Sequence, residues 1–202
     1  MLPSSGPAQF WIFAGPNGSG KSTAYAHLQP ERRDVPFWIV NPDLLTLQIQ
    51  EREGLTLDEA NIQAVTRLEA WLEATIRVHR SLGVETVLST PKYRRVVSLA
   101  KQHGFAIRLV YVVLNSPELN VERVRARVAR GGHDVPEHKI IERYWRSLEQ
   151  LPWFLRHADT AQVLDNSGET VELIAEKVDG MVRLHRSTIP AVAAAIKAAV
   201  SE

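Results

Sequence analysis

The residues whose types and spacing point most clearly to chemistry form one glycine-rich stretch near the N-terminus. It reads Gly15-Pro16-Asn17-Gly18-Ser19-Gly20-Lys21-Ser22-Thr23 and matches the pattern G-x-x-x-x-G-K-[ST] at every fixed position. Glycines let backbone N–H groups wrap closely around phosphate oxygens, because a Cβ atom would occupy that space. The pattern predicts that Lys21 reaches the β- and γ-phosphates of a nucleotide and that the Ser22 hydroxyl is a ligand of Mg²⁺.

The segments on either side of this loop have the secondary structure that the motif requires. An apolar run, Phe10-Trp11-Ile12-Phe13-Ala14, precedes it and is typical of a buried strand, and a helix-compatible run from Lys21 to Leu28 follows it. The N-terminus of such a helix carries partial positive charge, which favours a bound anion. A glycine-rich turn that carries a lysine by chance would not need this context, so the sequence favours a nucleotide site.

The composition narrows the classes of protein to which the chain can belong. Of 202 residues, 45% are hydrophobic and 23% are charged, and the net charge is +1, which is an ordinary globular balance. So small a net charge gives no general attraction to nucleic acid or to an anionic membrane, and a nucleic-acid partner is not expected. The absence of cysteine excludes disulfides, zinc–thiolate sites and thiol catalysis.

Two further features bear on where the protein works. The first residues, from Met1 to Pro7, lack the basic region and apolar core of a signal peptide. No apolar run approaches the length of about 18 residues that a membrane span needs. We therefore expect a cytoplasmic protein with no membrane partner.

Apolar runs alternate with helix-compatible runs along most of the chain. This alternation predicts an α/β fold with a parallel five-stranded sheet flanked by helices and a small helical lid, and the glycine-rich loop makes the P-loop NTPase or kinase type the expected one. We expect the whole chain, residues 1–202, to be one domain. The strands are predicted at residues 10–14, 35–40, 84–88, 106–114 and 161–165.

Capping residues and periodicity predict the main helices. Thr56 and Glu59 form a capping box ahead of a long helix. The lid is expected at about residues 117–136, and further helices at about 170–178 and 188–200. The predicted buried face of the long helix consists of Ile62, Val65, Leu68, Leu72 and Ile76.

Polar residues follow several predicted strands, at the edge where open parallel sheets bind ligands. Asp43 follows the second strand. It takes a proton from an attacking hydroxyl or holds Mg²⁺ through water, or it instead caps the next helix. Glu85 and Thr86 lie in or just after the third strand, and Asn166 follows the fifth. A carboxylate in an apolar strand is costly unless it faces a crevice or a cation, so Glu85 is either a site residue or a solvated loop residue.

The predicted lid carries a cluster of arginines. Arg123, Arg127 and Arg130 have the i, i+4, i+7 spacing of one helix face. Such a face either stabilises the charge of a transferred phosphate or is a solvated basic face paired with surface glutamates. Gly131-Gly132 provides a joint at which a lid can close. His133 either faces the substrate or orients the lid loop.

Several motifs together resemble the zeta-toxin-like P-loop kinases. They occur in the family's order over about residues 10–168. The most specific is Gly131-Gly132-His133-Asp134-Val135-Pro136, with Arg143-Tyr144 downstream. The other matching stretches are Gly15–Thr23, Asn41-Pro42-Asp43, Val84-Glu85-Thr86 with Leu88-Ser89, Arg123–Val128 and Asp165-Asn166-Ser167.

The resemblance implies that the protein uses ATP and Mg²⁺ to phosphorylate a hydroxyl of a UDP-N-acetyl sugar. The catalytic candidates are Lys21 as the phosphate lysine, Asp43 as the general base, and the arginines Arg123, Arg127 and Arg130. The nucleotide candidates are Gly15 to Thr23 and Asn166, and the metal candidates are Ser22 and Asp43. The substrate candidates are Asp43, Glu85, Thr86 and His133.

The chain departs from the family at two points. The third strand lacks the apolar run ending in aspartate of a Walker B motif, so Mg²⁺ is expected to rest mainly on Ser22 and Asp43. Thr90-Pro91-Lys92 stands where relatives often have a small glycine-containing turn, which bears on acceptor recognition. An antitoxin is a candidate partner, but the chain carries no segment that resembles one.

Two other functions stay open at this point. One is a nucleotide-dependent ATPase or binding module that regulates a partner, which the missing Walker B aspartate fits. The other is a nucleoside or polynucleotide kinase, against which the small net charge and the lack of an aromatic and basic stripe argue. ATP consumption that depends on an acceptor separates a kinase from a regulatory ATPase.

Overall fold

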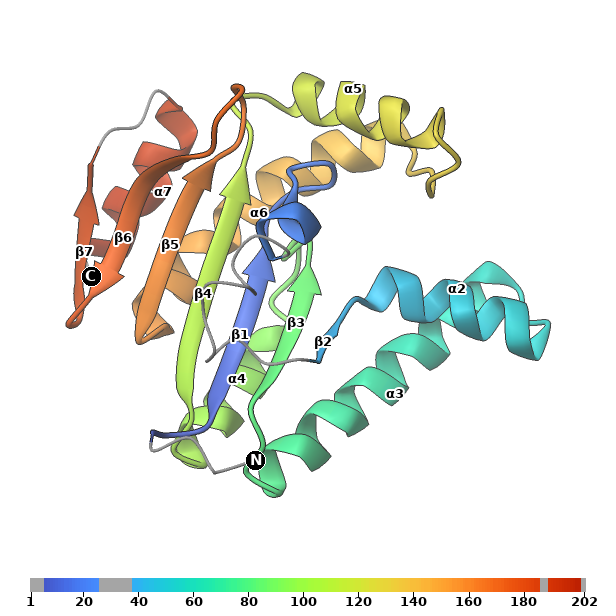
Figure 1. Ribbon diagram of the computed structural model, residues 1–202, viewed down its shortest axis with the longest axis horizontal. Helices are drawn as coiled ribbons and strands as arrows, with labels where there is room; N and C mark the ends of the chain where they lie inside the picture. The colour runs from blue at the N-terminus through green and yellow to red at the C-terminus, as the bar shows by residue number, and fades with distance from the viewer. Residues whose placement is uncertain (1–5, 26–37, 186–188, 201–202) are drawn as a thin grey trace.

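The chain forms an α/β fold around one mixed sheet of seven strands in the order β2-β3-β1-β4-β5-β6-β7 (Figure 1). The computed structural model describes residues 6–25, 38–185 and 189–200. The predicted end of the helix after Lys21, the start of the predicted 35–40 strand and residue 188 of the predicted C-terminal helix lie outside these residues.

The central part of the sheet is parallel, as the alternation of strands and helices predicts. β1 (Gln9–Ala14) lies between β3 (Leu82–Thr86) and β4 (Ala106–Val113), and both pairings are parallel. β2 (Ile39–Val40) extends the sheet beyond β3, and β5 (Thr160–Asp165) extends it beyond β4. Parallel strands all end at one edge, so this order brings the loops after β1, β2, β3 and β5 to one side of the molecule.

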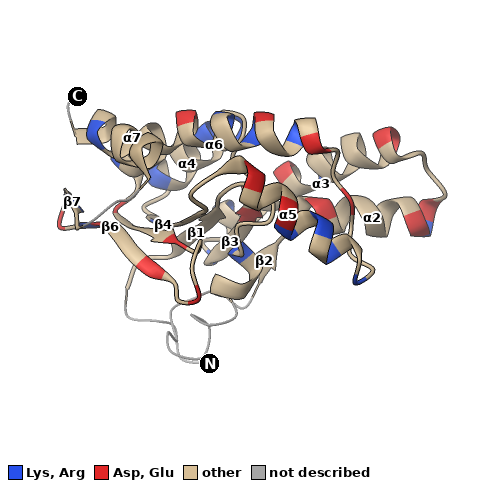
Figure 2. Ribbon diagram, turned by 90° about the horizontal axis from the view of Figure 1, so that it is seen from above, with Lys and Arg blue, Asp and Glu red and all other residues tan. Residues whose placement is uncertain are grey.

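Helices cover one face of this sheet and bury most of the core. They are α3 (Leu57–Arg77), α4 (Tyr93–Gln102), α6 (Glu137–His157) and α7 (Pro190–Val200), seen together on one side of the sheet in Figure 2. Phe10 and Ile12 of β1 point into this layer and are fully buried. Trp11 and Phe13 point to the opposite face, where they pack with Ala24 and Tyr25 from the segment after the glycine-rich loop.

Two helices lie near the carboxyl edge of the strands. α2 (Pro42–Glu53) follows β2 and packs on α3, and α5 (Pro117–Val128) follows β4 and packs on α6. In Figure 1, α5 runs across the top of the sheet, whereas α2 and α3 extend beyond its β2 side. Within the described residues, no helix is both long enough and apolar enough to cross a bilayer.

The prediction of five strands is wrong, because the sheet has two more strands after β5. β6 (Glu172–Val178) and β7 (Met181–Leu184) pair antiparallel at the β5 side, where the sequence pattern predicted a helix over 170–178. Asp179 and Gly180 join them with positive φ angles of 51° and 76°. An Asp-Gly pair in this conformation is a two-residue hairpin turn, and in a sequence it indicates two antiparallel strands. The residues before it have helical periodicity, which is why the sequence pattern predicted a helix instead.

Some predicted elements have different boundaries or faces. The buried face of α3 consists of Ala60, Ala64, Leu68, Leu72 and Ile76, whereas Ile62 is 65% exposed. The third strand begins at Leu82 rather than at Val84, so Glu85 lies within it. The lid region contains a helix over Pro117–Val128, so Arg130 lies in the turn beyond it.

The capping box at the start of α3 is confirmed. The Thr56 hydroxyl accepts a hydrogen bond from the Glu59 N–H, and the Glu59 carboxylate accepts one from the Thr56 N–H. We expect Thr56→Ala to lower the free energy of unfolding by about 1 kcal/mol, because it leaves helix N–H groups without partners. Urea unfolding followed by circular dichroism measures this change.

Thr66→Ala is the matched control. Thr66 is exposed in the middle of the same helix, and its hydroxyl donates only to the Ile62 carbonyl (3.0 Å). Alanine is the better helix former there, so this variant should be as stable as the original protein or slightly more stable. Equal destabilisation by both substitutions would contradict the role of the capping box.

Candidate functional site

A cleft of about 580 Å³ lies at the carboxyl ends of the parallel strands. It brings together the glycine-rich loop after β1, the start of α2 after β2, the end of β3 with the loop that follows, and the region after α5. Figure 2 looks onto this edge, with α5 lying over it. The predicted site residues that line the cleft are Asn17, Gly18, Lys21, Ser22, Asp43, Glu85, Thr86, Arg127 and His133.

The glycine-rich loop is so tightly enclosed that larger residues would not fit. Gly15 has φ +140°, and a Cβ there would lie 1.9 Å from the Val112 carbonyl oxygen of β4. Gly20 has φ +96°, and a Cβ there would lie 2.3 Å from the side-chain nitrogen of Asn166. Both the backbone angle and the lack of space therefore require glycine at these two positions.

Side chains from distant segments fix the conformation of this loop. Asn166, just after β5, donates from its side-chain amide to the Ser19 carbonyl (2.8 Å). Arg123 of α5 donates to the Asn166 carbonyl (2.7 Å). Asn120, also of α5, donates to the Asn17 carbonyl. The loop is therefore held between the end of β5 and the first turns of α5.

The loop residues fit a bound phosphate. The buried side-chain oxygens of Asn17 and Ser19 have no hydrogen-bond partner among the described residues. Lys21 is buried, and its ammonium donates to the Pro16 carbonyl (2.9 Å) across the loop. Burial lowers the pKa of Lys21, and the nearby carboxylates of Glu85 and Asp43 oppose that shift. An unmet polar lining around a lysine at a helix N-terminus suits an anion.

Ser22 and Glu85 meet at the edge of the sheet. The Ser22 hydroxyl donates to the Glu85 carboxylate, with distances of 3.0 and 3.1 Å to its two oxygens. β3 pairs directly with β1, and Glu85 is level with Phe13 near the start of the glycine-rich loop. Glu85 is thus a partly buried strand residue that faces the cleft, rather than a solvated loop residue. A hydroxyl and a carboxylate side by side are ligands that Mg²⁺ accepts.

Asp43 lies in the first turn of α2, but it does not cap that helix. Asn41 caps it, because its side-chain oxygen accepts from the N–H groups of Asp43 (2.9 Å) and Leu44 (3.4 Å). In the part of the chain that the structure describes, the Asp43 carboxylate has no hydrogen bond or ion pair. It is exposed in the cleft and close enough to Lys21 to raise the pKa of that lysine.

The three lid arginines do not share one environment. Arg127 lines the cleft, and its guanidinium donates to the His133 carbonyl (2.7 Å). Arg123 instead points to the Asn166 carbonyl and is not part of the cleft lining. Arg130 is exposed in the turn after α5. The expectation of one arginine face is therefore wrong, because the helix ends before Arg130 and because the residues at 123 and 127 contact different segments.

The cleft also contains two further cations, of which the sequence predicts Arg143 as a contributor from the helix after the lid and leaves Lys92 unassigned. Lys92 lies just before α4, and Arg143 lies on α6. Sequence signals for both exist: Arg143-Tyr144 is one of the motifs shared with the zeta-toxin-like kinases, and Lys92 ends the unusual Thr90-Pro91-Lys92 stretch. Only the fold shows that these two segments reach the same cleft.

The loop after β3 is tightly folded on the floor of this cleft. The Thr86 hydroxyl is buried and accepts from the Leu88 N–H (3.0 Å). Leu88 has a positive φ of 59°, which is strained for a branched side chain. Strain of this kind persists where the surroundings fix the backbone, and the next two residues of the loop, Ser89 and Thr90, line the cleft.

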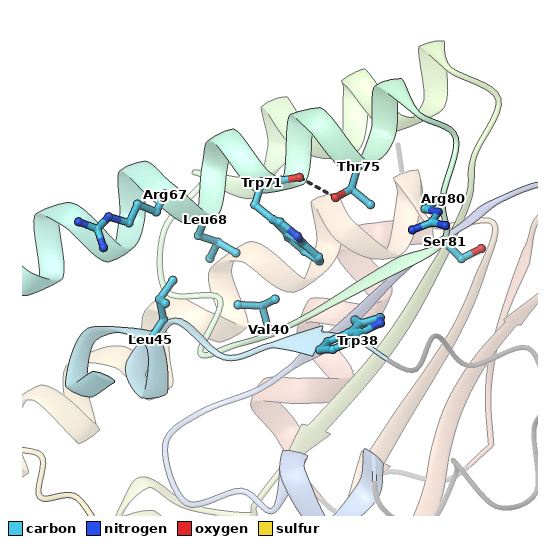
Figure 3. A pocket seen from close by; sticks show the side chains of 9 residues that line it. All are labelled: Trp38, Val40, Leu45, Arg67, Leu68, Trp71, Thr75, Arg80 and Ser81. Atoms are coloured by element: carbon cyan, nitrogen blue, oxygen red, sulfur yellow. Dashed lines mark hydrogen bonds between the residues drawn. The ribbon is translucent and has the colours of Figure 1, made fainter. Parts of the chain in front are cut away.

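A second hollow of about 650 Å³ lies at the β2 side of the sheet (Figure 3). Leu68 and Trp71 of α3 face Val40 and Leu45 across it, and Thr75 bonds to the Trp71 carbonyl (2.7 Å). Its lining is mainly apolar. Arg67 and Arg80 also line it, but among the described lining residues there is no carboxylate that could act as a base or hold a metal ion.

The close approach of Asn166 to Gly20 generates a prediction for nucleotide binding. We expect Gly20→Ala to weaken ATP binding by at least about tenfold, because the new Cβ displaces the side chain that fixes the loop. Titration calorimetry with ATP and Mg²⁺ measures the affinity. Gly104→Ala is the control, because Gly104 also has positive φ (+75°) but nothing lies within 4 Å of its added Cβ. Because Gly104 lies outside the cleft, the same loss in both variants would mean that a general effect on the fold, and not the displaced Asn166, is responsible.

The chain is similar to several known proteins. An uncharacterized protein from Haemophilus influenzae is 30% identical over 133 residues, which is 66% of this chain and 90% of the relative. The structure of the PezAT chromosomal toxin–antitoxin system of Streptococcus pneumoniae superposes with a TM-score of 0.63 at 16% identity, covering 98% of this chain and 80% of that one. The AvrRxo1-ORF1:-ORF2 structure with ATP superposes with a TM-score of 0.67 at 15% identity, covering 89% of this chain.

These structural likenesses, at such low identity, show a shared fold. This chain spans 61% of the AvrRxo1 chain, so part of that protein has no counterpart here. The Pnkp1/Rnl/Hen1 RNA repair complex has a TM-score of 0.56 at 19% identity, over 73% of this chain and 46% of that one. A family model described as AAA domain (AAA_33) matches residues 10–151. Because the matched residues make up more than half of this chain, the chain belongs to this family of AAA domains.

Proposed function

We propose that this protein is an ATP-dependent kinase of the zeta-toxin type, which transfers the γ-phosphate of ATP to a hydroxyl of a small acceptor. The observation that carries the proposal is the pairing of a phosphate-binding lysine, Lys21, with a free carboxylate, Asp43, in one cleft. A protein that only binds ATP has no need of a base, and an ATPase would use the same carboxylate on a water molecule, so dependence of turnover on an acceptor separates the kinase from the ATPase.

The glycine-rich loop would bind ATP, the phosphate donor. Its backbone N–H groups would cradle the phosphates, and Lys21 would exchange the Pro16 carbonyl for a phosphate oxygen. Arg127 is close enough to Lys21 to lower the pKa of that lysine, so both cations would act on the same phosphate group. Arg123 and Asn166 would support the loop rather than contact the transferred phosphate.

Mg²⁺ would bind at the meeting point of Ser22 and Glu85. The hydroxyl–carboxylate contact supports Glu85 as the acidic residue that the missing Walker B aspartate would otherwise supply. Asp43 would complete the metal's surroundings or remain free for the acceptor. When bound, the ion neutralises charge that develops on the β- and γ-phosphate oxygens.

The transfer itself requires only one proton acceptor from the protein. The acceptor oxygen forms a bond to the γ-phosphorus, the bond between that phosphorus and the bridging oxygen of ADP breaks, and the hydroxyl proton passes to Asp43. Lys21 and Arg127 hold the phosphate oxygens in place during the transfer. Closure of the lid over residues 117–136 would exclude water and so suppress hydrolysis of ATP.

A UDP-N-acetyl sugar is the acceptor that we propose first, from the resemblance to zeta toxins. Glu85, Thr86 and His133 line the cleft beyond Lys21 and offer hydrogen bonds to sugar hydroxyl and amide groups. A protein partner is part of the same proposal, since one structural neighbour is described as a toxin–antitoxin system. A regulatory ATPase is the second candidate, and acceptor-independent turnover would favour it.

Asp43→Asn tests the base. We expect kcat to fall by about 10²- to 10⁴-fold, because the amide cannot take the hydroxyl proton. ATP affinity should stay unchanged, since the glycine-rich loop is intact. Mass spectrometry of products formed from ATP, Mg²⁺ and UDP-N-acetylglucosamine measures the rate.

Asp58→Asn is the matched control, because Asp58 holds the same position in the first turn of α3 but lies outside the cleft. The acceptor panel should also include a nucleoside and an oligonucleotide with a free 5′-hydroxyl. ATP use that no acceptor stimulates would refute the kinase and leave the ATPase.

Glu85→Gln tests the metal site. The glutamine side chain can still accept a hydrogen bond from Ser22. The contact between β3 and the glycine-rich loop is therefore kept, while the negative charge is lost. We expect the Mg²⁺ concentration for half-maximal activity to rise, because a neutral amide attracts the ion less than a carboxylate does. Glu122→Gln, an exposed change on α5, serves as the control. An unchanged Mg²⁺ requirement in Glu85→Gln would remove Glu85 from the metal site.

A further inference from the structure

The hollow at the β2 side of the sheet lies between two elements of very different length (Figure 3). α3 has 21 residues and is therefore about 30 Å long, whereas β2 has only two residues. β2 can thus cover only a small part of the helix face that is turned towards it. Leu68, Trp71 and Thr75 of α3 line the hollow, and Val40 and Leu45 line it from the opposite side.

The size and the lining of this hollow are those of a small-molecule site. Its volume of about 650 Å³ falls within the range of about 300–1,000 Å³ that is typical of ligand pockets. Figure 3 shows the Trp71 ring pointing across the hollow towards Val40 and Trp38. Trp38 also lines the hollow, and it is 70% exposed. Two indole rings beside aliphatic side chains offer a surface on which a flat apolar ring system can stack.

The two arginines of the hollow differ in their partners. Arg67 lies at one end, and its guanidinium is already paired with the Glu53 carboxylate through two hydrogen bonds. Arg80 lies at the other end, and among the residues that the structure describes it has no ion pair. The hollow therefore has one cation whose charge is not balanced by a neighbouring carboxylate.

Ser81 adds a hydrogen-bond donor beside Arg80. Its hydroxyl accepts from the Gln9 N–H (3.0 Å), and no described residue accepts the proton of that hydroxyl. A carboxylate in this position would meet two donors, the guanidinium and the hydroxyl. It would meet no like charge, because no carboxylate is among the described lining residues. The lining thus fits one anionic group attached to an apolar body.

The hollow is separate from the cleft at the glycine-rich loop. No described residue lines both of them. The first turn of α2 stands between them, because Leu45 lines the hollow, whereas Asp43 and Leu44 line the cleft. A ligand in the hollow is therefore neither the nucleotide nor the acceptor of the proposed reaction.

We propose that this hollow is a second binding site, for a small molecule that joins a flat apolar ring system to one carboxylate. The ring system stacks against Trp71, and the carboxylate binds Arg80 and Ser81. This site does not depend on the proposed kinase function, because none of these three residues takes part in the proposed phosphate transfer.

A matched pair of probes tests the site on the full chain. 2-Naphthylacetate carries the ring system and a carboxylate, and 2-(2-naphthyl)ethanol is its neutral counterpart. Each is titrated into ¹⁵N-labelled protein, with and without the non-hydrolysable analogue AMP-PNP and Mg²⁺. The indole N–H signals locate the binding, and the signal of Trp71 is assigned with the variant Trp71→Phe. Calorimetry on the same samples gives the affinities.

We expect both probes to shift the Trp71 indole signal and to leave that of Trp145, an exposed residue of α6, unchanged. The carboxylate probe should bind about three- to tenfold more tightly, as expected for a hydrogen-bonded ion pair at an exposed arginine. Arg80→Gln should remove this difference without weakening the neutral probe, and Arg80→Lys should keep most of it. Arg77→Gln is the matched control, because Arg77 is exposed at the end of α3 but lies outside the hollow.

Four results would overturn the proposed site. The Trp71 signal does not move with either probe, the two probes bind equally to the original protein, or Arg80→Gln keeps the preference for the carboxylate. The fourth is loss of probe binding when AMP-PNP is present, which would place the probes in the cleft instead. None of these measurements uses ATP turnover, so the site and the proposed kinase function can fail independently.

Discussion

The hydrogen bond from the Asn166 side chain to the Ser19 carbonyl is the contact on which the rest of the site depends. It attaches the glycine-rich loop to the end of β5, while the Gly15 backbone packs against the Val112 carbonyl of β4. Arg123 holds Asn166 in turn. These contacts fix the shape of the loop, so little further ordering of its N–H groups would be needed for a phosphate to bind. Preorganisation of this kind lowers the entropic cost of binding.

The strand order then decides which groups meet around that loop. Because β3 is the direct neighbour of β1, Glu85 lies beside Ser22, although 63 residues separate them. β2 follows on the outer side of β3 and delivers Asp43 through the short turn at Asn41. A parallel sheet sends all of these loops to one edge, so one topology brings together the proposed phosphate lysine, the metal candidate and the proposed base.

Asp43 shares the cleft with several cations. Asp43 acts on both Lys21 and Lys92, and each lysine has an arginine near it. α5 contributes two arginines with different roles, because Arg123 donates to the Asn166 carbonyl, whereas Arg127 lines the cleft and donates to the His133 carbonyl. The same helix therefore provides both a structural arginine and a candidate for phosphate contact, one turn apart.

The sequence by itself determined the local features. It predicted the glycine-rich loop, the parallel strands, the capping box of α3 and the polar residues at the strand ends, because these depend on spacing, capping and periodicity within a few residues. Only the tertiary structure decided the rest. Helical periodicity concealed β6, whose pairing with β5 is a long-range contact. The free carboxylate of Asp43, the separation of the arginines and the convergence of Lys92 with Arg143 depend on which segments the fold places side by side, and a linear pattern does not contain that information.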